Sequence, residues 1–264
     1  MYQLALTGTG VALGEKVAIA IERLRTFAPP DGSDYWLAFS GGKDSGVIHR
    51  LAEMAGVPFE AHLSVTTVDP PELLYHVRRH YPSVMWHRPV KPMWARVIEQ
   101  GMPPTRTARW CCREYKECFG GDRTVIGVRA EESPARAKRW GVVTRMGRRV
   151  MISPIIDWTA ADVWEFHRAE GIPYCSLYDD GLKRLGCVLC PMSRTVDEDM
   201  ARWPGIARLW RKGVDGAWRR RKEAGQLEAE GSWKSQEEMW RWWINRDSGD
   251  TRNGEECDGL MLFS

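Results

Sequence analysis

The stretch Ser40-Gly41-Gly42-Lys43-Asp44-Ser45 decides how this sequence folds. The apolar run over residues 35–39 precedes it and predicts a buried strand, and apolar side chains recur at helical spacing over residues 47–55. A strand, a glycine turn and a helix N-terminus together favour phosphate binding. The glycines let the backbone come close to an anion, and the first N–H groups of the helix point at it. We therefore predict an anion site at residues 40–45.

The side chains of this stretch fit the same chemistry. Lys43 adds a compact positive charge, and the hydroxyls of Ser40 and Ser45 can donate to phosphate oxygens. Asp44 would repel phosphate, so its presence indicates a Mg²⁺ to which it can be an oxygen ligand. The lysine follows the glycine pair directly, unlike in the P-loop pattern GxxxxGK[ST]. An ordinary glycine turn before a helix is the alternative.

The rest of the first two thirds of the chain alternates strands with helices. Further strands are predicted over 58–67, 84–86 and 123–128, helices over 12–27, 71–81, 93–100 and 159–169, and a hairpin over 141–153. This order predicts an α/β fold with a parallel twisted sheet and helices on both faces. Ligands of such sheets bind at the carboxyl ends of the strands. Ser40, the turn ending at Asp69 and residues 127–129 would then converge on one crevice.

The last quarter of the chain is helical and basic. Eight Lys and Arg residues stand against Asp215 and Glu223 over residues 201–223, a net charge of +6. We predict a nucleotide-binding α/β domain over 1–192 and a helical region with a flexible tail over 193–264. One helix carries the stripe from Trp203 to Trp218, with Gly213 as a point at which it could break. Tryptophans at helical spacing favour a core or a subunit interface, whereas the basic residues leave open a nucleic-acid or protein partner.

Composition excludes several classes of protein. No stretch of about 18 apolar residues exists and no secretory signal is recognisable, so we expect a cytoplasmic protein. A formal net charge of +3 indicates nothing by itself. Seven cysteines, an odd number and unevenly spaced, favour metal or redox chemistry over a disulfide framework. The oligomeric state is left open.

Several stretches together resemble the phosphoadenosine phosphosulfate (PAPS) reductase-like family of the PP-loop ATP pyrophosphatases, whose fold is adenine nucleotide α-hydrolase-like. The matching pieces are Ser40–Ser45, Val68–Glu72, Cys111-Cys112 with Lys116, Gly127–Ser133 with Arg136, Pro154–Trp158, Leu177–Asp179 and Gly186–Pro191. The resemblance covers residues 30–195 and rests on their order and spacing.

The resemblance implies an adenine nucleotide as ligand. Lys43 is shared with the ATP-cleaving relatives and favours ATP, whose terminal phosphates carry more charge to neutralise. Gly127, Arg129 and Arg136 are then expected around the phosphates, with Lys43, Asp44 and Arg129 in catalytic roles. Asp69 is a candidate contact for the ribose or the adenine.

The cysteine pairs match the arrangement in iron–sulfur sulfonucleotide reductases. Vicinal cysteines such as Cys111 and Cys112 fit poorly on one zinc ion, but they can bind different irons of a [4Fe–4S] cluster together with Cys187 and Cys190. Zinc or free thiols are the alternatives. Cys118 and Cys175 are expected to pack in the interior.

Three functions follow. The first is an enzyme that cleaves ATP between the α and β phosphates and adenylates an acceptor for sulfur transfer. Relatives in DNA phosphorothioation and CRISPR-associated gene sets would give it a role in defence. The second is a PAPS or adenosine phosphosulfate reductase that uses Cys257, within the imperfect tail motif Glu256-Cys257-Asp258-Gly259-Leu260. The third is a non-catalytic accessory protein that binds a nucleotide or a nucleic acid.

Overall fold

The computed structural model describes residues 12–228 and 232–245. The chain divides into two compact units. Unit 1 contains the residues up to 64, 71–87 and 119–185, and unit 2 contains 65–70, 88–118 and the residues from 186 onward. Each unit therefore combines segments that are distant in sequence. The predicted domains, 1–192 and 193–264, are instead two continuous segments, and this division stays a prediction.

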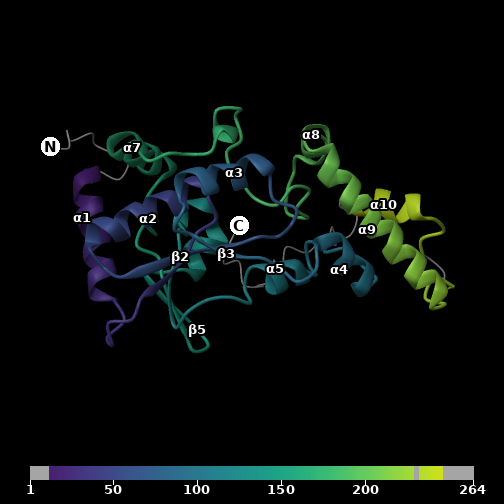
Figure 1. Cartoon of the computed structure of the whole chain (residues 1–264), viewed down its shortest axis with the longest axis horizontal. Helices are drawn as coiled ribbons and strands as arrows, with labels where there is room; N and C mark the ends of the chain where they lie inside the picture. The colour runs from purple at the N-terminus through teal and green to yellow at the C-terminus, as the bar shows by residue number, and fades with distance from the viewer. Residues whose placement is uncertain (1–11, 229–231, 246–264) are drawn as a thin grey trace. The chain divides into compact units, whose positions relative to one another are not determined.

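Unit 1 is built on a β-sheet (Figure 1). The sheet has six strands in the order β3-β2-β1-β4-β6-β5. Its strands are β1 (Tyr35–Ala38), β2 (Phe59–Ser64), β3 (Met85–His87), β4 (Arg123–Val125), β5 (Val143–Met146) and β6 (Arg149–Ile152). All neighbouring strands are parallel except β5 and β6, which form the antiparallel hairpin expected over 141–153. The predicted α/β class with a largely parallel sheet is confirmed.

Helices of unit 1 flank this sheet. They are α1 (Leu13–Thr26), α2 (Lys43–Ala55), α3 (Pro71–His80), α6 (Pro134–Arg139) and α7 (Ala160–Glu170), with the 3₁₀ turns η1 (Ala130–Glu132) and η2 (Ser176–Tyr178). The helices α1, α2 and α7 pack on one another. Tyr35 and Leu37 of β1 are fully buried, and the Tyr35 hydroxyl donates to the Leu24 carbonyl of α1 at 2.9 Å. Residues at alternate positions of a strand face opposite ways, so Trp36 lies on the other face of the sheet.

The strand order brings two predicted phosphate-binding segments to the same edge of the sheet. From β1 the chain runs outward through β2 to β3, then returns to form β4 on the other side of β1. The carboxyl ends of β1 and β4 therefore flank the switch point of the sheet, where ligands of such folds bind. Residues 40–45 follow β1 and Gly127 to Arg129 follow β4, so both predicted phosphate-binding segments of unit 1 come to this edge.

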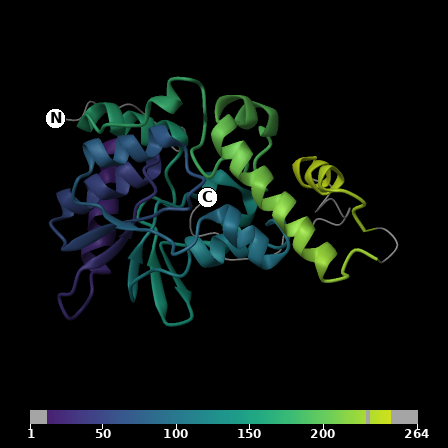
Figure 2. The same cartoon turned by 45° about the vertical axis from the view of Figure 1, so that its right-hand side comes forward.

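Unit 2 is helical. It contains α4 (Met93–Gln100), α5 (Trp110–Tyr115), α8 (Val196–Arg202), α9 (Pro204–Glu223) and α10 (Gln236–Ile244). Trp210 and Trp243 are fully buried with ring centroids 4.8 Å apart, as expected for tryptophans of a core. The break envisaged at Gly213 is wrong, since α9 is one continuous helix (Figure 2). Packing explains this glycine, because a Cβ there would lie 3.1 Å from the Trp94 backbone.

No helix within the two described ranges is long and apolar enough to cross a lipid bilayer.

Neutral histidines are buried in unit 1. His62 stacks on Trp36 with the ring centroids 3.4 Å apart, and its Nδ1 lies 2.9 Å from Nε2 of His87. Burial lowers the pKa of His62 to about 4, and the His87 ring adds to the shift. Burial also lowers the pKa of His76 in α3 to about 4, with smaller effects from His80 and His167. The fold therefore favours the uncharged form of both imidazoles.

We expect the free energy of unfolding to fall as the pH drops from 6.5 towards 4. In this window the unfolded histidines bind protons that His62 and His76 in the native state do not, so acid favours unfolding. Each histidine accounts for roughly 1–2 kcal/mol at pH 5. Urea unfolding at pH 7 and pH 5 measures the loss, and His62→Gln with His76→Gln should flatten the profile. An unfolding free energy that is equal at the two pH values in the wild type would contradict the expectation.

Candidate functional site

The loop after β1 is shaped by its own hydroxyls. The Ser45 hydroxyl donates to the Gly42 carbonyl at 2.8 Å, and the Ser40 hydroxyl lies 3.3 Å from Ser45 Oγ. Gly41 has a φ of +76°, a left-handed conformation that favours glycine. The helix α2 then begins at Lys43, with Gly42 in an extended conformation as its N-cap. This is the predicted strand, glycine turn and helix.

Gly41 is needed for packing as well as for conformation. A Cβ at this position would lie 2.6 Å from Val77 Cγ2 and 2.8 Å from Leu73 Cδ1, both in α3. We expect Gly41→Ala to lower the free energy of unfolding by roughly 2–3 kcal/mol, through left-handed strain and overpacking. Gly56→Ala is the matched control, because Gly56 has a φ of +66° with open space around it, and it should cost only about 1 kcal/mol. Equal losses in thermal or urea unfolding would show that the contact with α3 is irrelevant.

The first N–H groups of α2 differ in their partners. The Lys43 N–H donates to the Tyr178 hydroxyl at 2.9 Å, and the Gly42 N–H donates to Ser40 Oγ at 3.4 Å. Within the described residues, no acceptor faces the N–H groups of Asp44 and Ser45. Two amide donors at the positive end of a 13-residue helix are therefore open to an anion.

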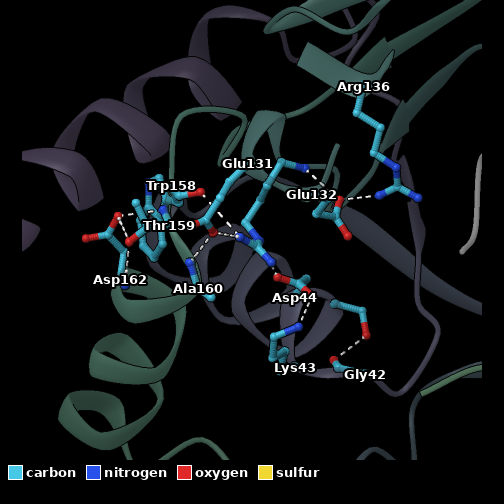
Figure 3. Close-up of polar contacts among 12 residues, drawn as sticks. Gly42, Lys43, Asp44, Glu131, Glu132, Arg136, Trp158, Thr159, Ala160 and Asp162 are labelled. Atoms are coloured by element: carbon cyan, nitrogen blue, oxygen red, sulfur yellow. Dashed lines mark hydrogen bonds and ion pairs between the residues drawn. The ribbon is translucent and has the colours of Figure 1, made fainter. Parts of the chain in front are cut away.

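Two cations share the Asp44 carboxylate. Lys43 Nζ lies 2.9 Å from Asp44 Oδ2 (Figure 3). Arg129 Nε lies 2.7 Å from Asp44 Oδ1. Only 7% of Lys43 and 4% of Arg129 is exposed, so this charge cluster is poorly solvated. Gly127 permits the close approach of the two segments, since a Cβ there would lie 3.1 Å from the Asp44 backbone. The fold thus brings together Lys43, Asp44, Gly127 and Arg129, which are predicted site residues.

Acidic residues hold the arginines on the β4 side. Glu131 Oε2 lies 2.7 Å from Arg129 Nη1 and accepts the Ala160 N–H at 2.6 Å, which ties Arg129 to the start of α7. Glu132 accepts the Arg129 backbone N–H. It also pairs with Arg136 (Figure 3), and the Arg136 side chain is buried. Arg136 is therefore engaged by Glu132 in this structure, and its expected contact with a phosphate stays a prediction.

Sequence reasoning missed two residues that position the loop. Tyr178 lies in one of the stretches that resemble the family, but no role was assigned to it from the sequence. Its hydroxyl accepts the Lys43 N–H, and its ring centroid lies 5.8 Å from Lys43 Nζ. Burial raises the pKa of this phenol, so it stays protonated and can still donate. His167 of α7 places Nε2 2.8 Å from the Lys43 carbonyl oxygen. A histidine within a helical pattern gave no signal of this contact.

The four cysteines of the predicted cluster all belong to unit 2. Cys111 and Cys112 are adjacent on α5, so their side chains point about 100° apart around the helix axis. The turn from Cys187 to Cys190 is fixed by backbone contacts, in which the Val188 N–H donates to the Val68 carbonyl at 2.8 Å.

Strained backbone flanks this contact. Thr67 and Leu189, each adjacent to one of the two valines, have positive φ values of 67° and 56°. The Leu189 N–H donates to Asp199 Oδ2 at 2.9 Å, and Cys187 Sγ lies 3.4 Å from Thr66 Oγ1. Left-handed non-glycine residues cost free energy and concentrate at functional sites.

The pKa shifts of Cys112 and Cys187 have opposite directions. Arg109 Nη2 lies 3.2 Å from Cys112 Sγ. The Cys111 thiol, together with the charges of Arg109 and Lys116, lowers the pKa of Cys112 to about 5 against the opposing effect of burial. Burial raises the pKa of Cys187 to about 11. In the described ranges, no three His, Cys, Asp or Glu side chains converge as ligands of one metal ion.

The remaining predicted residues have other surroundings. Asp69, in unit 2, accepts two hydrogen bonds from Thr66. The Thr66 N–H donates to Asp69 Oδ2 at 2.7 Å, and the Thr66 hydroxyl donates to Asp69 Oδ1 at 2.7 Å. Asp69 therefore holds its own turn, and its contact with ribose or adenine stays a prediction. Cys175 is buried as expected, whereas Cys118 is exposed. Cys257 lies outside the described residues.

A family model of the phosphoadenosine phosphosulfate reductase domain matches residues 34–193, more than half of the chain. The chain belongs to this family. The PAPS reductase domain therefore contains both the loop at residues 40–45 and all four cysteines of the predicted cluster. Its members are nucleotide-binding enzymes of the adenine nucleotide α-hydrolase-like fold, as the resemblance of the sequence implied. The expected role in defence stays a prediction.

Proteins similar to this chain differ in how much of it they cover. Two uncharacterised proteins of Methanocaldococcus jannaschii are 29% and 33% identical over 58% and 59% of this chain, which spans only 40% and 35% of their length. An adenosine 5'-phosphosulfate reductase of Neisseria meningitidis serogroup B is 30% identical over 77% of this chain and 91% of its own. Among solved structures, the PAPS reductase of Candida auris aligns with a TM-score of 0.49 and 17% identity, over 70% of this chain and 98% of its own.

Proposed function

We propose that the chain binds ATP at the N-terminus of α2 and cleaves it between the α and β phosphates. The observation that carries this proposal is the buried cluster in which Lys43 and Arg129 share Asp44, next to the open N–H groups of Asp44 and Ser45. Two cations and two amide donors at one helix end match a polyphosphate better than a single small anion. An acceptor nucleophile attacks the α-phosphorus, the bond to the bridging oxygen breaks, and its electron pair leaves with pyrophosphate.

Residues of the loop act by electrostatics. When the phosphates enter, Lys43 and Arg129 turn from the Asp44 carboxylate towards the phosphate oxygens and neutralise the charge that builds up on the leaving pyrophosphate. Mg²⁺ bound to phosphates commonly has one or two protein carboxylates as ligands. Asp44 would be such a ligand once Lys43 and Arg129 have moved away from its carboxylate. Bound Mg²⁺ supplies further charge neutralisation on the phosphates. The Tyr178 hydroxyl keeps the first amide of α2 in place.

A second candidate is adenosine phosphosulfate or PAPS reduction. The 30% identity to the Neisseria reductase over 91% of that protein favours it. The Cys257 thiolate would attack the sulfonate sulfur and break its bond to the phosphate oxygen, so that the nucleotide leaves and Cys257 carries the sulfonate. A thioredoxin-like dithiol would then reduce this adduct and release sulfite.

One pair of assays separates the candidates. ATP with Mg²⁺ is tested for pyrophosphate release, and adenosine phosphosulfate or PAPS with a thioredoxin is tested for sulfite release. Pyrophosphate release that depends on Lys43 supports the first proposal, and sulfite release that is lost in Cys257→Ser supports the second. Stabilisation by ATP without either product would overturn both and leave a nucleotide-binding accessory protein.

We further propose that Cys111, Cys112, Cys187 and Cys190 hold a [4Fe–4S] cluster. The donor set fits, because each thiolate binds its own iron and adjacent cysteines need not converge on one point. The nearby charges of Arg109 and Lys116 would offset the negative charge of a cluster. A cluster would supply sulfur or redox chemistry for the acceptor. Anaerobic preparation should give a brown protein with iron and acid-labile sulfide, and Cys187→Ser should lose both while Cys118→Ser retains them. Colourless wild-type protein with zinc or free thiols would contradict this.

A further inference from the structure

The outward face of α9 in unit 2 has no role in the chemistry proposed above. The opposite face of this 20-residue helix is buried through Trp210, Val214 and Ala217. Gly213 and Gly216 lie against α4, where a Cβ at Gly216 would be 2.6 Å from the Ile98 side chain. The glycines let α4 and α9 approach closely, and they fix which face of α9 remains exposed.

Four exposed basic residues form a row on that face. They are Arg208, Lys212, Arg219 and Lys222, and we name this row the α9 basic face. Spacings of four, seven and three residues place the four side chains on the same side of a helix. At 1.5 Å per residue, the row from Arg208 to Lys222 is about 21 Å long. The helix contains only two acidic residues, Asp215 and Glu223.

Within the described residues of unit 2, no ion pair neutralises the charge of the α9 basic face. Asp215 is engaged by Arg211 at 2.7 Å, and no carboxylate in the described residues lies within ion-pair distance of the four cations. Two of them lie over aromatic rings instead, with Lys212 Nζ 3.7 Å from the Trp94 ring centroid and Lys222 Nζ 5.2 Å from that of Trp218. These contacts restrain the side chains and leave their full positive charge available to a partner.

We propose that the α9 basic face binds the phosphate backbone of a nucleic acid. A row of cations about 21 Å long, with no carboxylate partner among the described residues, complements a polymer with regularly spaced phosphates. Binding releases the counterions of that polymer. A protein partner is disfavoured, because stable interfaces need buried aromatic or aliphatic anchors. Among the described residues of α9, Leu209 is the one large apolar side chain that is exposed, at 37%.

The test uses the full chain and fluorescein-labelled 20-nucleotide single-stranded DNA, single-stranded RNA and duplex DNA, followed by fluorescence anisotropy. We expect binding of at least one probe, weakened roughly 50-fold or more between 50 and 200 mM salt if four phosphates are contacted. Replacing all four residues of the α9 basic face by glutamine should lower affinity at least tenfold and reduce the salt slope by about three. The three probes distinguish RNA, single-stranded DNA and duplex DNA as the source of the backbone.

The matched control removes four exposed charges from unit 1, with Arg79, Lys138, Arg145 and Arg148 each replaced by glutamine. It should keep the wild-type affinity and salt slope. Equal losses in both variants, or no binding of any probe by the wild type at 50 mM salt, would overturn the proposal. Pyrophosphate release from ATP without nucleic acid should be unchanged in both variants, so failure here is separate from failure of the nucleotide chemistry.

Discussion

Replacing Lys43 by alanine is expected to lower ATP-dependent pyrophosphate release at least a hundredfold. The ammonium lies 2.9 Å from Asp44 at the start of α2, beside the open amides of the loop, and only 7% of the residue is exposed. A preorganised cation in such a poorly solvated position stabilises developing charge far more than it would in water, and removing one donor of this kind costs about 10²–10³ in rate. Steady-state kinetics with a pyrophosphate-coupled assay measures the loss.

Two controls sharpen this experiment. Lys138→Ala removes an exposed lysine of α6 in the same unit and should leave the rate unchanged. Thermal unfolding of Lys43→Ala should remain close to wild type while the stabilisation by added ATP is reduced, because Arg129 still pairs with Asp44. A Lys43→Ala variant that releases pyrophosphate within threefold of the wild-type rate would remove the ammonium from the proposed mechanism.

Replacing Lys16 by methionine is expected to lower the free energy of unfolding by about 3–5 kcal/mol. Lys16 Nζ of α1 lies 2.6 Å from Asp162 Oδ2 of α7, and the two side chains are only 5% and 0% exposed. Asp162 also accepts the Thr159 N–H at 2.7 Å and so caps α7. Burial alone would raise the pKa of Asp162, but Lys16 and Thr159 lower it overall, which shows that the carboxylate depends on these partners. Without Lys16, the buried Asp162 carboxylate has no counterion among the described residues.

Urea unfolding measures this loss, and two further variants interpret it. The double variant Lys16→Met with Asp162→Asn removes the charge and should recover part of the stability. Arg50→Met breaks a pair with Glu170 in which the arginine side chain is 42% exposed, and it should cost less than about 1 kcal/mol. A loss below 1 kcal/mol for Lys16→Met would mean that water reaches Asp162.

Local patterns in the sequence were sufficient for several features of this protein. The loop at residues 40–45 could be predicted because its glycine turn and the start of the following helix depend on six consecutive residues. In the structure, α2 begins at Lys43. The helix predicted over 159–169 is observed as α7, whose cap is made locally by Thr159 and Asp162, three positions apart. Alternation of strands with helices was enough to predict the parallel sheet, since a crossover helix must return each strand in the same direction.

Only the tertiary structure decided which distant groups meet. Arg129 and Asp44 are 85 positions apart, and Tyr178 and Lys43 are 135 apart, so their contacts depend on strand order and helix packing. The same holds for Gly213, where propensity suggested a break but close packing on Trp94 requires the glycine within a continuous helix. A local sequence pattern can predict a helix, a strand or a turn. It cannot predict the counterion of a buried charge, because the packing of the whole unit determines which distant residue lies beside that charge.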